Sequence, residues 1–259
     1  METIGLIAAM PQESGALLHY IRRWRRISIG PLRGNIFELS GLTCVLVTSG
    51  MGIRRASEAT RALVKTHSPR LLISFGIAGA VGADLEIGDV VLAEAVCQLY
   101  GDTPEPLLPL KLWSDAARES AAKALARRGA CLYPGTAITT GGSQVMEYRL
   151  GEMTHPILEM ETAGIAQVAT ESSIPLLSLR SISDGPRAPI PIDLGEMMDE
   201  DANLQTGKLM LAIIHNPKIV LHFGRVLRNS RKAADNAAYA LLAALNTTTF
   251  ERSQGRPNA

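Results

Sequence analysis

Short apolar runs that alternate with helix-like segments most restrict how this 259-residue chain can fold. Runs at 4–8, 43–48, 71–75 and 176–183 have the length and composition of buried strands, and they stop at glycine, a small residue or an acid. Segments with the 3.6-residue spacing of an amphipathic helix follow several of them. Strands that alternate with helices form a sheet covered by helices. The sequence therefore predicts an α/β fold with a mixed central sheet flanked by helices.

The remaining elements can be placed along the chain. Further strands are expected at 26–29, 35–39, 89–99, 137–140 and 157–159, and helices at 12–24, 55–66, 114–128 and 160–170. A last helical stretch is expected over about 202–245, with breaks near Asn216-Pro217 and Asn229-Ser230. No linker or internal repeat is visible. We therefore expect a single domain over residues 1–245 and a disordered polar tail over 246–259.

Composition excludes several classes of protein. The formal net charge is +1, which gives no general electrostatic reason to bind nucleic acid or an anionic membrane. No signal peptide and no membrane span are recognisable, so the chain is expected in the cytoplasm. Cys44, Cys97 and Cys131 are interpreted as buried thiols rather than disulfide partners or nucleophiles. The five histidines show no close pairing, so no metal site is predicted.

One acid stands at the end of a buried strand. The run 176–186 reads LLSLRSISDGP and places Asp184 directly after the apolar stretch. Ligands of open α/β sheets bind at the carboxyl ends of strands. Apolar surroundings raise the pKa of a carboxyl group toward the range in which it can donate a proton. A role as a helix cap or turn residue stays open from this stretch alone, because Ser-x-Ser-Asp-Gly-Pro is also good turn chemistry.

Two glycine clusters and two further acids also follow strands. Ser49-Gly50-Met51-Gly52 and Phe75-Gly76-Ile77-Ala78-Gly79 would let a ligand approach the backbone closely. Neither is a dinucleotide fingerprint or a phosphate loop. Glu13 and Glu161 each open a helix after a strand, where the simplest interpretation is an exposed acid in the first turn.

Taken in order, these segments resemble the purine nucleoside phosphorylase/uridine phosphorylase superfamily. They are most similar to its methylthioadenosine/S-adenosylhomocysteine nucleosidase branch and to hopanoid-associated nucleoside phosphorylases. The matching segments, between residues 4 and 184, are IGLIAAMPQES, VTSGMG, LLISFGIAGAVGADLEIGDVVLAEA, ILEMETAGIAQVA and LLSLRSISD. The resemblance implies a three-layer phosphorylase-like sandwich, a small nucleoside as substrate, no cofactor and a homodimer.

The resemblance also implies roles for the acids. Asp184 would be the general acid that protonates N7 of the purine as the N-glycosidic bond breaks. Ser183 would help to hold the base and orient that acid. Glu13 would position and deprotonate the attacking water, and Glu161 would bind the ribose hydroxyls. Carboxylates around the sugar suit this chemistry, because the ribosyl group becomes cation-like in the transition state.

Other matched residues are expected to contact or support the substrate. Met160 would pack against the sugar, and Arg180 would support the carboxylates from nearby. Gly76, Ile77 and Met51, in the two glycine clusters, are further candidate substrate-binding residues.

The nucleophile decides between two activities. Phosphorylases of the superfamily bind phosphate with a Gly-Asp-Pro-x-Arg type segment after the first strand, where this chain has Met10-Pro11-Gln12-Glu13. They also place an arginine and a serine around the second glycine cluster, where this chain has Ser74 and Ile77. The resemblance therefore favours hydrolysis of a 5′-modified adenosine-type nucleoside. Phosphorolysis remains an alternative, because the distant Arg23, Arg33 and Arg54 could contribute in the folded protein.

Some features depart from the nucleosidase pattern. The segment expected to stack an aromatic ring on adenine reads Thr140-Gly141-Gly142-Ser143-Gln144, without a ring. The longer C-terminal part makes an adenosylhopane-like substrate with a bulky apolar 5′ group a further alternative, and a non-catalytic nucleoside-binding protein is another. Residues that could line a pocket for such a group, or simply pack the core, are Leu209, Met210, Ile213, Ile214, Val220 and Leu221.

Overall fold

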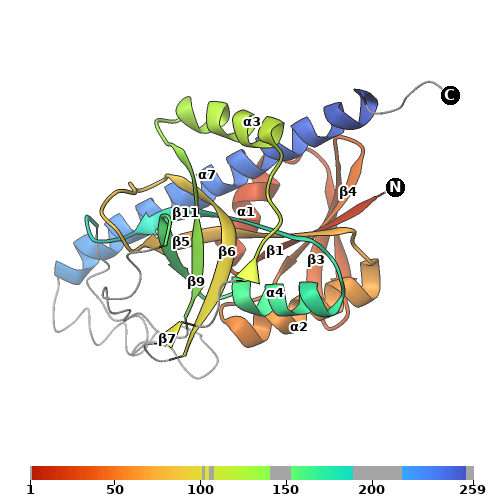
Figure 1. The fold of residues 1–259 in the computed structure, drawn as a ribbon, viewed down its shortest axis with the longest axis horizontal. Coiled ribbons are helices and arrows are strands. Elements are labelled where there is room, and N and C mark those ends of the chain that lie inside the picture. The colour runs from red at the N-terminus through yellow and green to blue at the C-terminus, as the bar shows by residue number, and fades with distance from the viewer. Residues whose placement is uncertain (1, 101–102, 105–107, 141–152, 189–217, 255–259) are drawn as a thin grey trace.

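The computed structural model describes residues 2–100, 103–104, 108–140, 153–188 and 218–254. Figure 1 shows a central sheet with helices on both faces. The strands are β1 Thr3–Ala8, β2 Trp24–Ile29, β3 Leu32–Leu39, β4 Leu42–Thr48, β5 Leu71–Ala80, β6 Val90–Tyr100, β7 Thr103–Pro104, β8 Leu108–Pro109, β9 Leu132–Thr139, β10 Pro156–Glu159 and β11 Leu176–Asp184. The helices are α1 Pro11–His19, α2 Ile53–His67, α3 Asp115–Ala126, α4 Thr162–Glu171 and α7 Lys218–Gln254.

The sheet is mixed, as predicted. Its strand order is β10-β9-β6-β11-β5-β1-β4-β3-β2. The neighbours β11, β5, β1 and β4 run parallel, whereas β3 and β2 form an antiparallel hairpin at one edge. At the other end β10 pairs with both β9 and β5, so β5, β11, β6, β9 and β10 close into a ring. The carboxyl ends of the central parallel strands therefore lie at one edge of the sheet, beside this ring.

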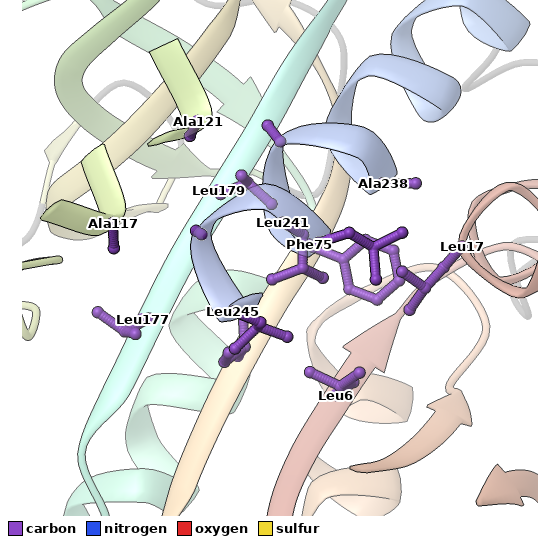
Figure 2. Close-up of a cluster of buried hydrophobic side chains, with 14 of the residues drawn as sticks. Leu6, Leu17, Phe75, Ala117, Ala121, Leu177, Leu179, Ala238, Leu241 and Leu245 are labelled. Carbon is purple, nitrogen blue, oxygen red and sulfur yellow. The ribbon is translucent and has the colours of Figure 1, made fainter. Parts of the chain in front are cut away.

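Helices bury apolar residues on each face of the sheet. On one face α1, α3 and α7 contribute Leu17, Leu125 and Leu241 to a cluster that includes Leu6 and Phe75 of the strands. Figure 2 shows how α7 lies over β5 and β11 in this cluster. On the other face α2 and α4 pack on residues of β1, β4 and β5. The three-layer sandwich implied by the resemblance is confirmed.

Two predicted element boundaries and one predicted helix break were wrong. The first helix ends at His19 rather than at residue 24, because the chain from Trp24 pairs with β3. The strand predicted over 71–75 continues to Ala80, because its glycine cluster pairs with β11 and β10. The C-terminal helix shows no break at Asn229-Ser230. After Ser230 the helix has an alanine-rich face that is buried in the core. This tertiary packing outweighs the weak helix propensity of Asn229 and Ser230.

Some of the other expectations were confirmed and others were wrong. Cys44 and Cys97 are buried as predicted, but Cys131 is exposed at the turn before β9. The helix α7 runs on to Gln254, past the predicted boundary at residue 245, so residues 246–254 are helical rather than disordered. The single domain over 1–245 stays a prediction. In the part of the chain that the structure describes, no helix combines the length and apolarity that crossing a membrane would need.

Candidate active site

Acids and glycines from five strands meet at the carboxyl edge of the sheet. The strand β1 leads into Glu13 of α1, and β4 leads into the turn with Met51 and Gly52. The glycine cluster of β5, residues 76–79, lies between β1 on one side and β11 on the other. The strand β11 carries Arg180 and ends at Asp184. The strand β10 ends at Glu159, and Met160 and Glu161 connect it to α4. The ends of four parallel strands, together with β10, which runs antiparallel to β5, thus bring together residues that lie far apart in the sequence.

Glu13 turns into the protein instead of facing solvent. Its exposed fraction is 1%, although it stands in the first turn of α1. Its Oε2 accepts a hydrogen bond from the Met10 N–H at 2.8 Å, and its Oε1 accepts one from the Ile77 N–H at 2.9 Å. Burial raises the pKa of Glu13, while the charge of Arg180 and backbone donors oppose that rise. The interpretation as an exposed helix acid is therefore wrong.

Gly76 makes room for this arrangement. A Cβ atom at this position would lie 2.2 Å from Glu13 Oε1 and 2.6 Å from Arg180 Nη1. Both are closer than non-bonded atoms can approach. Gly76 thus lets Glu13 and Arg180 approach each other across the backbone of β5.

Arg180 is the buried cation at the centre of the site. Its Nη2 donates to Ser74 Oγ at 2.9 Å and to Glu159 Oε2 at 2.9 Å, and lies 3.6 Å from Glu161 Oε2. Burial lowers its pKa, but the charges of Glu159, Glu161 and Glu13 outweigh this and raise it. Its buried Nε and Nη1 have no hydrogen-bond partner among the described residues. Arg180 therefore contacts the carboxylates, and its role as their support stays a prediction.

Glu159 belongs to the same cluster and was missed by the sequence analysis. Its Oε2 accepts hydrogen bonds from the Glu161 N–H at 3.0 Å and the Thr162 N–H at 2.8 Å, and its Oε1 accepts one from Thr139 Oγ1. It thereby fixes the turn between β10 and α4 and holds Arg180 at the same time. A signal was present in the sequence, since an acid within a short buried strand needs a partner.

Glu161 lies at the N-terminus of α4, as predicted, and is buried. Its Oε1 accepts a hydrogen bond from the Gly52 N–H at 3.0 Å. Gly52 has a φ of 98°, a conformation that favours glycine. Burial together with the charges of Glu159 and Glu13 raises the pKa of Glu161 to about 7, against the opposing charge of Arg180. Glu161 therefore exchanges a proton near neutrality.

Asp184 is the last residue of β11 and not a helix cap. The strand β11 has a β-bulge before Asp184. Ile182 pairs with Ala78 of β5 and Asp184 pairs with Gly79, so β11 advances by two residues where β5 advances by one. Bulges redirect side chains and occur often beside active sites. Ser183 Oγ donates to Asp184 Oδ1 at 2.6 Å, and a Cβ atom on Gly79 would lie 2.8 Å from Oδ2. Burial raises the pKa of Asp184 despite this hydrogen bond, as the sequence predicted.

The structure brings some predicted residues into direct contact and leaves others adjacent. Glu13, Glu161 and Arg180 form one cluster, which also uses the Ile77 N–H. Asp184 lies four residues beyond Arg180 on β11, roughly 13 Å along the strand. Met51 and Met160 are partly exposed neighbours of the residues that contact Glu161.

Two sets of predicted residues cannot be compared with the structure. The structure does not describe these residues, or, for Val220 and Leu221, does not describe their side chains. The two sets are Gly141, Gly142, Ser143 and Gln144 of the expected stacking segment, and the proposed pocket residues Leu209, Met210, Ile213, Ile214, Val220 and Leu221. Within the described ranges, no group of three or more His, Cys, Asp or Glu side chains is arranged to hold a metal ion.

Comparison with known proteins gives consistent findings. A model of the phosphorylase superfamily matches residues 3–215. A 5′-methylthioadenosine/S-adenosylhomocysteine nucleosidase of Listeria innocua is 31% identical over 204 residues, which cover 70% of this chain and 86% of that protein. The corresponding protein of Shewanella piezotolerans is 29% identical over 231 residues, or 82% of this chain and 98% of its own.

A solved structure agrees at the level of the fold. The nucleosidase of the same name from Colwellia psychrerythraea, in complex with adenine, aligns over 95% of both chains with a TM-score of 0.70 and 20% identity.

Proposed function

This chain belongs to the phosphorylase superfamily, and from that premise we propose that it is an N-ribosyl hydrolase of a 5′-modified adenosine-type nucleoside. The products are adenine and a ribose derivative. The proposal is supported by relatives named as methylthioadenosine/S-adenosylhomocysteine nucleosidases, and by the buried acids at the carboxyl edge of the sheet.

The proposed reaction uses the acids in distinct roles. Asp184, whose pKa is raised by burial, donates its proton to N7 of the purine as the bond between C1′ and N9 breaks. Glu13 accepts a proton from water while the water oxygen bonds to C1′. Glu161 accepts hydrogen bonds from the ribose hydroxyls, next to Met160. The buried negative charge of this cluster stabilises the cation-like ribosyl group.

One observation favours water over phosphate as the nucleophile. The Ile77 N–H, which would otherwise face an anion, already donates to Glu13, and Arg180 Nη2 already donates to Ser74 Oγ and Glu159 Oε2. Glu159, Glu161 and Glu13 surround Arg180, so the described core of the site carries no excess positive charge. A phosphate dianion needs several such donors or cations. Arg23 and Arg33 are exposed on the β2–β3 edge, and Arg54 pairs with Glu58 on the surface of α2.

The test is adenine release from methylthioadenosine, S-adenosylhomocysteine and adenosine, each with and without inorganic phosphate. We expect release at the same rate in both conditions and free ribose derivatives as products. Release that depends on phosphate, with a ribose 1-phosphate product, would overturn the hydrolase assignment.

A phosphorolytic enzyme is the second candidate, and the position of Arg55 favours it. Arg55 lies against the Gly50 turn, where a Cβ atom would be 3.0 Å from its Cδ and 3.3 Å from its Nη1. If phosphate is the nucleophile, Arg55→Gln raises the KM for phosphate without changing the KM for the nucleoside. The KM for the nucleoside is unchanged by this variant with either nucleophile, so the raised KM for phosphate is the result that identifies phosphate as the nucleophile.

The identity of the 5′ group is a further part of this proposal. We propose a methylthio- or homocysteinyl-like group first, and a bulky apolar group of the adenosylhopane type second. Absence of release from all three small nucleosides, together with adenine release from an adenosine carrying a long apolar 5′ chain, identifies the second. Binding of nucleosides without release identifies a non-catalytic protein. A homodimer in the cytoplasm completes the proposal on the basis of the family resemblance.

A further inference from the structure

Four arginines surround one exposed tryptophan at the free edge of the sheet. The sequence 22–26 reads RRWRR, and all five side chains are exposed. Trp24 exposes 42% of its surface, although it begins the edge strand β2. We name residues 22–26 the arginine–tryptophan patch.

The arginines of the patch are not neutralised locally. Among the described residues, the side chains of Arg22, Arg23, Arg25 and Arg26 have no hydrogen bond or ion pair. Elsewhere on the described surface arginines do pair with acids, as Arg61 does with Glu171 and Arg70 with Glu2. The patch thus concentrates four unpaired positive charges in five residues of a chain whose net charge is only +1.

The shape of the edge adds an apolar surface to this charge. Residues 20–25 and 36–39 line a groove of about 850 Å³, and Ile21, Trp24 and Ile36 contribute apolar side chains to it. Glu38 is the carboxylate in its lining, and it accepts a hydrogen bond from Thr43. None of the lining residues belongs to the acid site at the carboxyl edge.

Protection of a free strand edge explains only part of the patch. Charged residues on edge strands discourage pairing with other chains, which accounts for Arg25 and Arg26 on β2. Arg22 and Arg23 precede the strand, and an exposed indole would favour association rather than prevent it. The combination of arginines and an exposed indole suits a partner that is both anionic and partly apolar.

We propose that the arginine–tryptophan patch docks this protein on the surface of an anionic lipid bilayer. Arginines bind the headgroup phosphates, and the indole of Trp24 enters the interface where tryptophan is preferred. Single-stranded nucleic acid fits less well, because its binding requires several aromatic side chains on which successive bases stack, and the patch offers one. The net charge of the chain predicts no such affinity, but binding depends on local charge within a Debye length. The inference does not depend on the proposed activity.

The experiment is sedimentation of the full-length protein with vesicles of phosphatidylcholine alone or mixed equally with phosphatidylglycerol. We expect binding to the mixed vesicles only, and release at high salt. The quadruple variant R22Q/R23Q/R25Q/R26Q should weaken partitioning by at least about tenfold, since each arginine near an anionic surface contributes about fivefold. Trp24→Ala should weaken binding without changing its salt dependence.

Matched variants separate docking from loss of fold or of charge. The variant R61Q/R70Q/R118Q/R127Q removes the same charge from other exposed positions and should bind vesicles like the wild type. The variant R22K/R23K/R25K/R26K keeps the charge of the patch and should retain binding. Melting temperatures of all variants check the fold.

Three outcomes of the binding experiments would overturn the proposal. They are equal binding to the two kinds of vesicle, binding unaffected by the quadruple glutamine variant, and tighter patch-dependent binding to a single-stranded oligonucleotide than to vesicles. Patch-dependent self-association in sedimentation velocity without vesicle binding would likewise assign the patch to a second copy of the chain.

Discussion

At the scale of single residues, the absence of a side chain at position 76 determines whether the site can form. The space that a methyl group would fill at Gly76 is occupied by Glu13 Oε1 and Arg180 Nη1. We expect Gly76→Ala to displace Glu13 and to lower kcat/KM at least about 100-fold, since small misplacements of catalytic groups have effects of this size. Adenine-release kinetics measure the loss.

The matched control for this substitution is Gly15→Ala in α1. No atom lies within 4 Å of the position that its Cβ would take. Alanine also favours the helix over glycine by up to about 1 kcal/mol. Gly15→Ala should therefore keep full activity and an equal or higher melting temperature. Equal activity of Gly76→Ala and Gly15→Ala would show that Glu13 is not needed at its present position.

Asp184 gives a prediction on pH dependence. Its protonated form is the proposed acid, so kcat should fall as the pH rises through its pKa, which burial raises. Asp184→Asn should lower kcat by about 10²–10⁴-fold and remove this alkaline limb. Ser183→Ala removes the hydrogen bond that lowers the pKa of Asp184, so it should move the limb to higher pH. A limb that stays in place in both variants would assign it to another group.

At the scale of elements, a polar cluster fastens α7 to the rest of the fold. Arg128, after α3, pairs with Asp235 of α7, donates to Asn236 Oδ1 at 2.8 Å and lies over the ring of Tyr239. Asn236 in turn donates to the carbonyl of Gly88 at 2.8 Å. The Gly88 N–H donates to the carbonyl of Ile182, two residues before Asp184. The helix is therefore connected to the strand that carries the proposed acid.

Removal of this cluster should cost stability. Arg128→Met leaves Asp235 without its cation and should lower the free energy of unfolding by roughly 1–3 kcal/mol. Arg61→Met is the matched control, because Arg61 pairs with Glu171 across an exposed surface. Its effect should stay within about 0.5 kcal/mol. Urea denaturation of both variants measures the difference, and equal losses would show that the Arg128 cluster acts like a surface pair.

At the scale of the whole molecule, the buried acids make stability depend on pH. The pKa of Glu161 rises from 4.5 to about 7, mainly through burial. Burial also raises the pKa values of Glu13 and Asp184. The folded state therefore binds these protons more tightly than the unfolded state. This stabilisation is complete below a pH of about 4.5 and is lost as the pH rises through about 7.

We expect the free energy of unfolding to fall between about pH 5 and about pH 8, with Glu161 contributing up to about 3 kcal/mol. Glu161→Gln removes the titrating group and should flatten the fall over this range. Calorimetric melting of both proteins at several pH values tests this. An equally steep fall in the variant would exclude Glu161 as its source.

The sequence by itself determined much of this protein. Apolar runs such as 4–8 and 176–183 indicated buried strands, because their short length and the small or acidic residues that end them favour a strand over a helix. Local signals such as Ser114 before α3 marked a helix start, and its Oγ does accept a hydrogen bond from the Ala117 N–H. The positions of Glu13, Glu161 and Asp184 after strands made them candidates, and the family resemblance supplied their expected roles.

Only the tertiary structure decided how those residues meet. The burial of Glu13 depends on the Ile77 N–H, 64 positions away, and that of Glu159 on Arg180, 21 positions away. Likewise, the extension of β5 through its glycines results from pairing with β10 and β11. Local sequence patterns contain no information about such partners. Whether an acid is an exposed helix residue or part of a buried catalytic cluster is set by what the folded chain places against it.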